Sequence, residues 1–374
     1  MKIGIPKEIK DHEHRVGMTP PGVYELAKSG HQILVQKNAG HSIGIDDNDY
    51  VSVGANICNS AEEIFMEADL VIKVKEPQSN EIALLHENQI LFTYLHLAPD
   101  EIQTTALIES GVTAIAYETV TDPQGGLPLL APMSEVAGRM SVQAGAAGLE
   151  IERGGRGVLL GGVPGVSRGN VTIIGGGVVG SNAAFVASGM GANVTIIDKS
   201  YKRMAELDFH FKSLISTLHS TTHTIENAVK EADLVVGAVL IPGSTAPKLL
   251  TRDMVKAMKR GSVIVDVAID QGGCVETSKP TSHSNPYFLD EGVVHYCVTN
   301  MPGAVARTST FALNNATLPF ILSIAELGTK EAMRKDPHLM NGLNVCDGKL
   351  TYQAVAHAQG RDYTKPSEVL NLRG

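Results

Sequence analysis

The chain has 374 residues, 43% of them hydrophobic, which is long enough for two domains with substantial cores. A formal net charge of −9 and an aromatic content of 5%, with no tryptophan, argue against the basic, base-stacking surfaces of nucleic-acid-binding proteins. No His, Cys or carboxylate cluster has metal-ligand spacing, so we expect no metal site and four reduced cysteines, at positions 58, 274, 297 and 346.

The amino-terminal residues 1–8 begin a strand at once and contain no apolar signal core. The chain has no run of about 18 apolar residues, the length that a membrane-spanning helix needs. We therefore expect a cytoplasmic protein without a membrane span.

The first 125 or so residues alternate predicted strands with predicted helices. Strands are expected at 2–5, 31–37, 69–74, 89–95 and 112–116. Helices are expected from Thr19-Pro20-Pro21 to Gly30 and over 99–110. This alternation predicts a doubly wound parallel sheet of βαβ units.

Charged and titratable side chains follow the ends of these strands. Because open parallel sheets bind ligands at the carboxyl ends of their strands, this edge would suit a small carboxylate substrate. The residues concerned are Lys7, Glu8, Arg15, Lys75, Glu76, Tyr94, His96, Tyr117 and Glu118.

The centre of the chain carries a glycine-rich loop between a predicted strand over 171–174 and a predicted helix over 179–190. Within the loop, residues 175–180 fit the pattern G-x-G-x-x-G. Gly175 would permit the tight turn, Gly177 the approach of a pyrophosphate, and Gly180 close packing of helix on strand. The amino terminus of the helix would then favour the anion.

A further strand over 193–197 ends at Asp198, where a ribose hydroxyl would need an acceptor. The acid favours NAD over NADP, although the basic residues Lys199, Lys202 and Arg203 would also suit a 2′-phosphate. With strand, helix and acid all present, the pattern predicts a dinucleotide-binding Rossmann domain rather than a purely structural turn.

The rest of the chain completes the predicted architecture. Ser134 is expected to cap a helix over 135–150. Strands at 234–239, 262–267 and 293–298 extend the nucleotide-binding sheet, and a helix over 308–327 follows it. The last 45 or so residues are too few to fold alone and should pack on the first domain.

The expected fold is therefore α/β, with two doubly wound Rossmann-like domains. The nucleotide-binding domain, 129–306, would be inserted into a substrate domain formed by 1–128 and 307–374. The cleft between the two domains would be the natural active site.

Motifs along essentially the whole chain resemble the bacterial NAD-dependent L-alanine dehydrogenases, whose superfamily includes the NAD-binding subunit of proton-translocating transhydrogenase. The motifs are MKIGIPKE (1–8), HRV (14–16), VIKVKEP (71–77), YLH (94–96), PMSE (132–135), GGGVVG (175–180), DVAIDQGG (266–273) and TNMPG (299–303). The resemblance implies interconversion of L-alanine with pyruvate and ammonia, using NAD, in a homohexamer.

The resemblance implies that Arg15 binds the substrate carboxylate, since a guanidinium grips a carboxylate bidentately, although by itself the residue reads as a surface arginine. Lys75 would hold the substrate carboxylate or carbonyl oxygen. It is preferred to Lys73, which shares its face if the strand runs through both, because Lys75 lies past the strand's end.

His96 is the expected general acid and base, because an imidazole exchanges protons near neutrality. Asp270 would orient or deprotonate the attacking water together with His96, and it is also expected to contact the cofactor, with a turn-forming aspartate as the competing interpretation. Asn300 would bind the cofactor or the substrate. Ser134 resembles a cofactor-contacting serine of the family, with an N-cap as the alternative.

The resemblance places further cofactor contacts at Ser220, Val239, Leu240, Val267 and Met301, although methionines are more often core residues. Two other functions compete with the alanine dehydrogenase interpretation. One is an NAD(H)-binding subunit of a transhydrogenase-type complex, and the other is a 2-hydroxy-acid dehydrogenase of similar two-domain shape.

Overall fold

The computed structural model describes residues 1–239 and 246–372, and the chain divides into two compact units. The first unit comprises Met1–Met133 and Val305–Gly374, and the second comprises Ser134–Ala304. The sequence predicts changes of domain at 128/129 and 306/307; in the structure the units change at 133/134 and 304/305.

The first unit is built on an eight-stranded sheet in the order β15-β14-β6-β5-β4-β1-β2-β3. The strands β1 to β6 are parallel, and their order is that of a doubly wound Rossmann sheet. Strands β2 and β3 are added on one side of β1, and β4, β5 and β6 on the other, so the strand order reverses between β1 and β4. Their bounds are Lys2–Ile5, Gln32–Gln36, Ala55–Cys58, Leu70–Ile72, Ile90–Thr93 and Thr113–Ala116.

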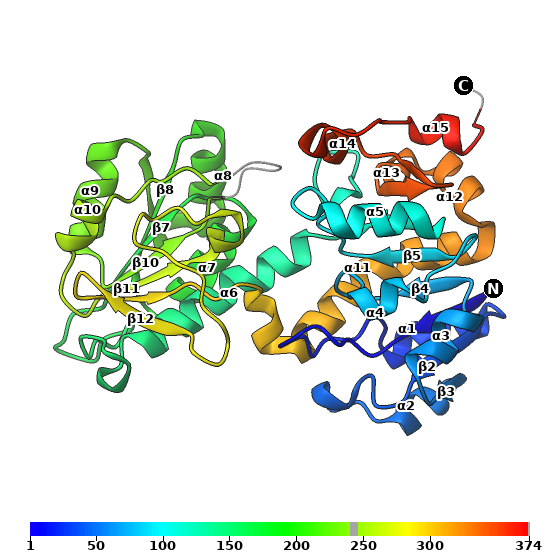
Figure 1. Cartoon of the computed structure of the whole chain (residues 1–374). Helices are drawn as coiled ribbons and strands as arrows, with labels where there is room; N and C mark the ends of the chain where they lie inside the picture. The colour runs from blue at the N-terminus through cyan, green and yellow to red at the C-terminus, as the bar shows by residue number, and fades with distance from the viewer. Residues whose placement is uncertain (240–245, 373–374) are drawn as a thin grey trace. The chain divides into compact units, whose positions relative to one another are not determined.

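The carboxyl-terminal segment, which the sequence predicts to pack on the first domain, adds two strands to this sheet. Strand β14 (Leu343–Cys346) pairs antiparallel with β6, and β15 (Lys349–Leu350) pairs antiparallel with β14. Figure 1 shows the blue-to-cyan and the orange-to-red parts of the chain in this one unit, which the green-to-yellow unit interrupts in sequence.

Helices surround the first sheet. Residue 20 begins α1 with the fixed φ of proline, and Asp100 caps α5 by accepting a hydrogen bond from Gln103 N at 2.9 Å. The bounds are α1 Pro20–Lys28, α2 Asp47–Val51, α3 Ala61–Glu67, α4 Ser79–Ile82, α5 Glu101–Ser110, α11 Ala306–Leu327, α12 Thr329–Lys335, α13 Pro337–Met340, α14 Gln353–Gln359 and α15 Pro366–Val369, with 3₁₀ turns η1 His41–Ile43 and η2 Tyr117–Thr119.

The second unit repeats the same strand order in a seven-stranded sheet, β12-β13-β11-β10-β7-β8-β9, in which only β12 is antiparallel. The strands are β7 Asn170–Ile174, β8 Asn193–Asp198, β9 Ile215–His219, β10 Leu234–Gly237, β11 Val263–Asp266, β12 Tyr287–Asp290 and β13 Val293–Tyr296. The helices are α6 Ala131–Gly148, α7 Val178–Gly189, α8 Tyr201–Phe211, α9 Thr222–Glu231 and α10 Arg252–Lys256, with 3₁₀ turns η3 Ile151–Arg153, η4 Lys212–Leu214, η5 Val267–Gln271 and η6 Met301–Val305.

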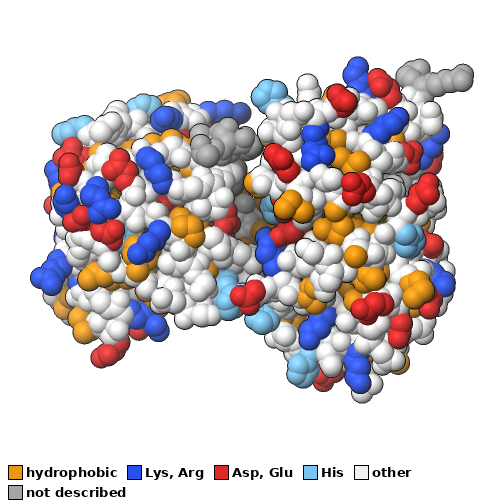
Figure 2. Space-filling view, in the orientation of Figure 1, with side chains coloured by type: hydrophobic (Ala, Val, Ile, Leu, Met, Phe, Trp, Pro, Cys, Tyr) orange, Lys and Arg blue, Asp and Glu red, His pale blue; other side chains and the backbone are white. Residues whose placement is uncertain are grey.

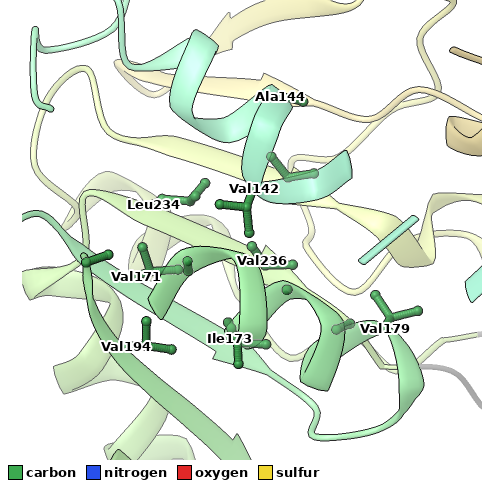
Figure 3. Close-up of a cluster of buried hydrophobic side chains, with 14 of the residues drawn as sticks. Val142, Ala144, Val171, Ile173, Val179, Val194, Leu234 and Val236 are labelled. Atoms are coloured by element: carbon green, nitrogen blue, oxygen red, sulfur yellow. The ribbon is translucent and has the colours of Figure 1, made fainter. Parts of the chain in front are cut away.

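One core cluster of the second unit lies between its sheet and the helices α6 and α7 (Figure 3), and a second includes residues of α9 and α10. Val171 and Ile173 of β7 pack with Leu234 and Val236 of β10 beneath Val142 of α6. The central strands are apolar along their whole length because helices cover both faces of a parallel sheet. The expected fold class, two doubly wound units with one inserted into the other, is confirmed.

Five strands have no counterpart in the prediction: β3, β9, β12, β14 and β15. Of these, β14 is a buried inner strand, and the other four are edge strands. Residues of an edge strand are partly exposed, so these segments lack the continuous buried apolar run that identifies a central strand.

Two further details differ from the sequence prediction. Ser134 is not the N-cap of its helix, because α6 begins at Ala131, whose N–H already bonds to the carbonyl of Leu127 at 2.9 Å. Strand β4 ends at Ile72, so both candidate lysines lie past its end.

Acidic and basic side chains are interspersed over the visible face of each unit (Figure 2), which shows no extended surface of a single sign. Among the described residues, no helix is both long enough and apolar enough to cross a bilayer. The four cysteines are free thiols.

Candidate active site

The first unit gathers four of the polar residues singled out in the sequence. Arg15 lies in the loop after β1, Lys75 after β4, His96 after β5 and Glu118 after β6. These strands are parallel neighbours, so their carboxyl ends share one edge of the sheet. This edge is where a doubly wound sheet binds its ligand.

Arg15 is a buried side chain, only 2% exposed, and not a surface arginine. Its Nε and Nη2 donate to the two carboxylate oxygens of Glu13, at 2.6 and 2.5 Å. Burial alone would raise the pKa of Glu13, but the bonds to Arg15 outweigh it and the pKa is lowered. Nη1 lies 3.1 Å from the sulfur of Met133, a weak acceptor that a carboxylate would readily displace.

Lys75 is partly buried near this pair. Burial lowers the pKa of its ammonium, and the positive charges of Arg15 and Lys10 lower it further, against the opposing effect of Glu76 and Glu13. Within the described residues, the ammonium of Lys75 makes no hydrogen bond and no ion pair within 4 Å. Because Glu76 pairs with Lys10, Lys75 is the positive charge that these carboxylates leave uncompensated.

Lys73 has an entirely different environment. It is fully buried, and its ammonium donates to Glu8 at 3.0 Å and to Glu81 at 2.8 Å. The same Glu8 carboxylate accepts from the backbone N–H of Val74 at 2.6 Å and of Lys75 at 3.4 Å. The buried ion-pair network therefore holds the turn that carries Lys75, and Lys73 itself is a structural residue.

His96 has an exposed ring, with 48% of the side chain accessible, stacked on the buried ring of Tyr94 at 5.8 Å between centroids. Its Nδ1 lies 3.9 Å from the Glu118 carboxylate, which also accepts from the backbone N–H of His96 at 2.6 Å. The backbone of His96 is left-handed, with φ of 50°. Such a conformation is uncommon for a residue other than glycine and persists only where neighbouring groups hold it.

The glycine loop of the second unit has the geometry that its sequence predicts. Gly175 has φ of 99°, and a Cβ added at Gly180 would lie 1.9 Å from the carbonyl oxygen of Gly175. A Cβ at Gly177 would meet nothing within 4 Å. Gly177 is the N-cap of the 12-residue helix α7 and supplies no side-chain cap, so the helix terminus remains accessible to a pyrophosphate.

Asp198 ends β8 beside this loop. One carboxylate oxygen accepts from Gly176 N and the other from Ser200 N, both at 2.7 Å. Two such bonds leave acceptor capacity on the carboxylate for a ribose hydroxyl. Ser220 lies next to it at the end of β9, since its N–H bonds to the carbonyl of Asp198 at 2.9 Å.

The two basic residues after Asp198 differ in environment. Arg203 donates to the carbonyl of Gly176 at 2.6 Å, to Ser181 Oγ at 2.7 Å and to Glu206 at 2.9 Å. These bonds allow Arg203 to stabilise the conformation of the glycine loop. Lys202 is exposed.

Asp270 is exposed on η5, the 3₁₀ turn that follows β11. The turn is organised by the fully buried Asp266, whose carboxylate accepts from the N–H groups of Ala268, Cys274 and Val275 at 2.9 to 3.2 Å. After Asp270, Gly272 takes φ of 88°, which allows the chain to reverse there.

Asn300 follows β13 with left-handed backbone, φ 57°. Its carbonyl accepts from Gly303 N at 2.9 Å and lies 3.2 Å from His283 Nε2. Met301, next in the chain, is 3% exposed and belongs to the core of the second unit. A cofactor contact by Met301 would therefore use its backbone.

The remaining predicted cofactor residues lie at element ends. Val239 follows β10, and its Cγ2 would lie 3.1 Å from a Cβ added at Gly175, which places it at the glycine loop. Val267 begins η5, and Ser134 lies in the first turn of α6. Leu240 falls outside the described residues.

Each unit thus contains a group of the predicted site residues. The first unit holds Arg15, Lys75 and His96, and the second holds the glycine loop with Asp198, Ser220 and Val239. Three carboxylates that orient these residues were not assigned a role from sequence: Glu13, Glu118 and Asp266. Asp266 carries a readable signal, since it ends an apolar strand just before a turn with two glycines. The pairing of Glu118 with the backbone of another strand's end has no local signal.

Two family descriptions match the chain. "Alanine dehydrogenase/PNT, N-terminal domain" matches residues 4–137, and "Alanine dehydrogenase/PNT, C-terminal domain" matches residues 141–353. Among curated proteins, the chain is 57% identical to the alanine dehydrogenase of Halomonas elongata over 370 residues, covering 99% of this chain and 100% of that protein. It is 55% identical to the alanine dehydrogenase of Methanococcus maripaludis over 372 residues, again covering 99% and 100%.

Solved structures give the same result. A structure described as L-alanine dehydrogenase superimposes with a TM-score of 0.94 at 51% identity, covering 96% of this chain and 99% of that one. A transhydrogenase from Sinorhizobium meliloti superimposes with a TM-score of 0.84 at 23% identity, covering 94% and 100%. At that identity the second comparison shows a shared fold alone.

Proposed function

The chain belongs to the alanine dehydrogenase/PNT family, and from this premise we propose that it catalyses the reversible, NAD-dependent oxidative deamination of L-alanine. In this reaction L-alanine, NAD⁺ and water give pyruvate, ammonium, NADH and a proton. The first unit would be the substrate domain and the second the NAD-binding domain.

One observation carries the proposal: Lys75 is a partly buried ammonium without a counter-charge, near the buried guanidinium of Arg15. Glu13 compensates Arg15, and Glu76 compensates Lys10, so one positive charge remains. An uncompensated buried charge is costly unless a ligand of opposite sign completes the site. A small carboxylate such as that of alanine or pyruvate supplies this sign.

In the proposed mechanism, Arg15 and Lys75 hold the substrate, with Lys75 also stabilising negative charge on the carbonyl oxygen. Loss of hydride from Cα leaves an imino acid, and water adds to its carbon. His96 moves the protons that this addition and the departure of ammonia require. Asp270 orients the water, and Asn300 binds the substrate or the nicotinamide side of the cofactor.

NAD fits the second unit on two observations. A Cβ at Gly177 would project into open space at an uncapped helix terminus, and Asp198 retains acceptor capacity beside it. When bound, the dinucleotide supplies the hydride acceptor. Gly175, Gly177 and Gly180 would shape the pyrophosphate site, and Asp198 would bind the ribose.

Other contacts in the NAD site are proposed at Ser134, Ser220, Val239, Val267 and Met301. Because the guanidinium of Arg203 is hydrogen-bonded to Gly176 and Ser181, the exposed Lys202 is the basic residue better placed to influence a 2′-phosphate. Asp198 would still repel that phosphate, so NAD is preferred to NADP.

We also propose a cytoplasmic homohexamer, on the strength of family membership. A measurement of molar mass by light scattering after gel filtration tests the assembly. A mass of about 39.7 kDa, that of one chain, would contradict it.

The activity is tested by incubating the full chain with NAD and either L-alanine or L-lactate, and following NADH. NADH should form with L-alanine alone. Formation with L-lactate alone would refute the proposal in favour of a 2-hydroxy-acid dehydrogenase. No turnover of either, with NADH still binding, would favour a transhydrogenase-type subunit.

The role of His96 is tested by His96→Ala, with the exposed His223→Ala as the matched control. His96→Ala should lose turnover by about 10²–10⁴-fold, the usual contribution of a general acid or base, while NADH still binds. His223→Ala should remain active. Near-normal kcat in His96→Ala would contradict the acid and base role.

A further inference from the structure

The loop that carries His96 is held by side chains from three separate elements. Glu118, in η2, accepts from the backbone N–H groups of Leu95 at 3.2 Å and of His96 at 2.6 Å. Gln103, in α5, donates its amide Nε2 to the carbonyl of Leu95 at 2.8 Å. These bonds fix the peptide groups on the amino-terminal side of His96.

The carboxyl-terminal side of His96 is held by a residue from the far end of the chain. Gln359, the last residue of α14, donates Nε2 to the carbonyl of Leu97 at 2.6 Å. The same amide nitrogen lies 3.1 Å from Thr104 Oγ1 on α5. The Leu97 carbonyl also accepts from Asp100 N at 2.9 Å, which closes the turn after His96.

We propose that Gln359 is a positioning residue for His96. It acts through the backbone: its amide donates to the carbonyl of the Leu97–Ala98 peptide, the second peptide after His96, while Glu118 and Gln103 hold the peptides before His96. Between these anchors His96 is held at φ of 50°, in the left-handed region that favours glycine. A strained residue relaxes when its surroundings no longer determine its conformation.

The consequence concerns the direction of the imidazole. Because the ring of His96 is exposed, the backbone, rather than burial of the ring, determines where it points, with stacking on Tyr94 as its side-chain support. Loss of the Gln359 anchor would let φ of His96 move toward the ordinary region and turn the ring away from its working position. The carboxyl-terminal helix α14 thereby takes part in catalysis without touching the substrate. The inference rests on the proposed role of His96.

The neighbouring Arg361 provides a matched control. Its Nη2 donates to the carbonyl of Glu101 at 3.2 Å and to Thr105 Oγ1 at 2.5 Å. These bonds attach the same carboxyl-terminal segment to the same helix α5, but they do not reach residues 95–98. A loss of activity caused by general loosening of the segment would appear in both variants.

The test compares the full-length variants Gln359→Met and Arg361→Met, with kcat and KM for L-alanine, the Kd for NADH and the melting temperature measured for each. Gln359→Met should lower kcat by about 10- to 100-fold, the scale expected when a catalytic group is misplaced by about 1 Å. The KM for L-alanine and the Kd for NADH should change little, because Arg15, Lys75 and the second unit do not depend on Gln359. Arg361→Met should keep kcat within about twofold of the parent.

The inference is overturned if Gln359→Met keeps the parental kcat, or if Arg361→Met loses as much kcat as Gln359→Met. Gln359→Glu has the same size but places an acceptor against the Leu97 carbonyl. It should lower kcat like Gln359→Met and serves if the methionine variant does not fold. Parental kcat in a folded Gln359→Glu would equally overturn the inference.

His96→Asn separates this inference from the proposed function. An active His96→Asn would refute the catalytic role of His96, whatever the Gln359 variants do. An inactive His96→Asn together with a fully active Gln359→Met would leave that role standing and refute the positioning role alone.

Discussion

Replacing Lys73 by methionine should destabilise the first unit strongly, although the two side chains are similar in length. The substitution removes the only ammonium that the described structure places within hydrogen-bond distance of both Glu8 and Glu81, and both carboxylates are buried to 98% of their side-chain surface. In the parent, burial raises the pKa of Glu8, opposed chiefly by the charge of Lys73. Two buried carboxylates cannot both remain ionised without that charge.

The magnitude follows from the cost of protonating one of them. For an ordinary glutamate pKa of about 4.3, protonation at pH 7 costs roughly 3.7 kcal/mol, at ~1.36 kcal/mol per pH unit. Breaking a buried ion pair by removing one partner generally costs about 3–5 kcal/mol, in agreement with this value. We therefore expect Lys73→Met to lower the free energy of unfolding by about 4 kcal/mol at pH 7.

The pH dependence gives the sharper test. In Lys73→Met the folded-state pKa of one carboxyl group is raised above its unfolded value, so the folded state binds a proton that the unfolded state has lost. Protonation becomes easier as the pH falls, and the deficit relative to the parent should shrink by about 1.36 kcal/mol per unit, to about 1 kcal/mol at pH 5. The deficit should grow again as the pH rises.

Hydrogen exchange measured by mass spectrometry suits this chain, which has two units and no tryptophan. Peptides covering β4 and β5 report on the first unit, and peptides covering β7 serve as an internal reference. Lys75→Met is the matched control, because burial and Arg15 already disfavour the charge of Lys75. It should leave exchange almost unchanged and lower turnover. Equal destabilisation by the two variants, or a deficit independent of pH, would refute the reasoning.

Three further outcomes are expected. Gly177→Ala should leave the melting temperature unchanged but weaken NADH binding, whereas Gly180→Ala should destabilise the second unit, since its Cβ would lie 1.9 Å from a backbone oxygen. The reverse pattern in thermal melts and NADH titrations would refute the assignment of the two glycines. Asp198→Ala should weaken NAD binding and admit NADP; unchanged affinities would show that Asp198 is not the ribose acceptor. Burial lowers the pKa of His295, so its neutral form stabilises the fold above about pH 6.5 and this stabilisation is lost as the pH falls below it. His295→Gln should therefore flatten the decline of melting temperature below pH 6.5, and an unchanged decline would contradict this.

Much of the fold can be predicted from short stretches of the sequence. The run 171–174, the glycines 175–180 and the strand ending at Asp198 specify a strand, a turn and a helix through short-range geometry, and the structure has each of them. Central parallel strands are equally readable because both faces are buried and the sequence is apolar throughout. Edge strands such as β3 and β9 are not readable in this way, because their partly exposed residues alternate without a clear period.

The candidate site likewise has features that local sequence predicts and features that depend on the tertiary structure. The sequence by itself determined which strand ends carry charge, and the family resemblance of its motifs singled out Arg15, Lys75 and His96 among these residues. Only the tertiary structure decided what each charge faces: Lys73 meets two buried carboxylates, whereas Lys75, two residues later, meets none within 4 Å among the described residues. It also decided that Gln359 holds the loop of His96. Charge compensation and backbone anchoring depend on groups that are distant in sequence. Neither the hydrophobic periodicity nor a sequence motif indicates which of these distant groups will be neighbours in the folded protein.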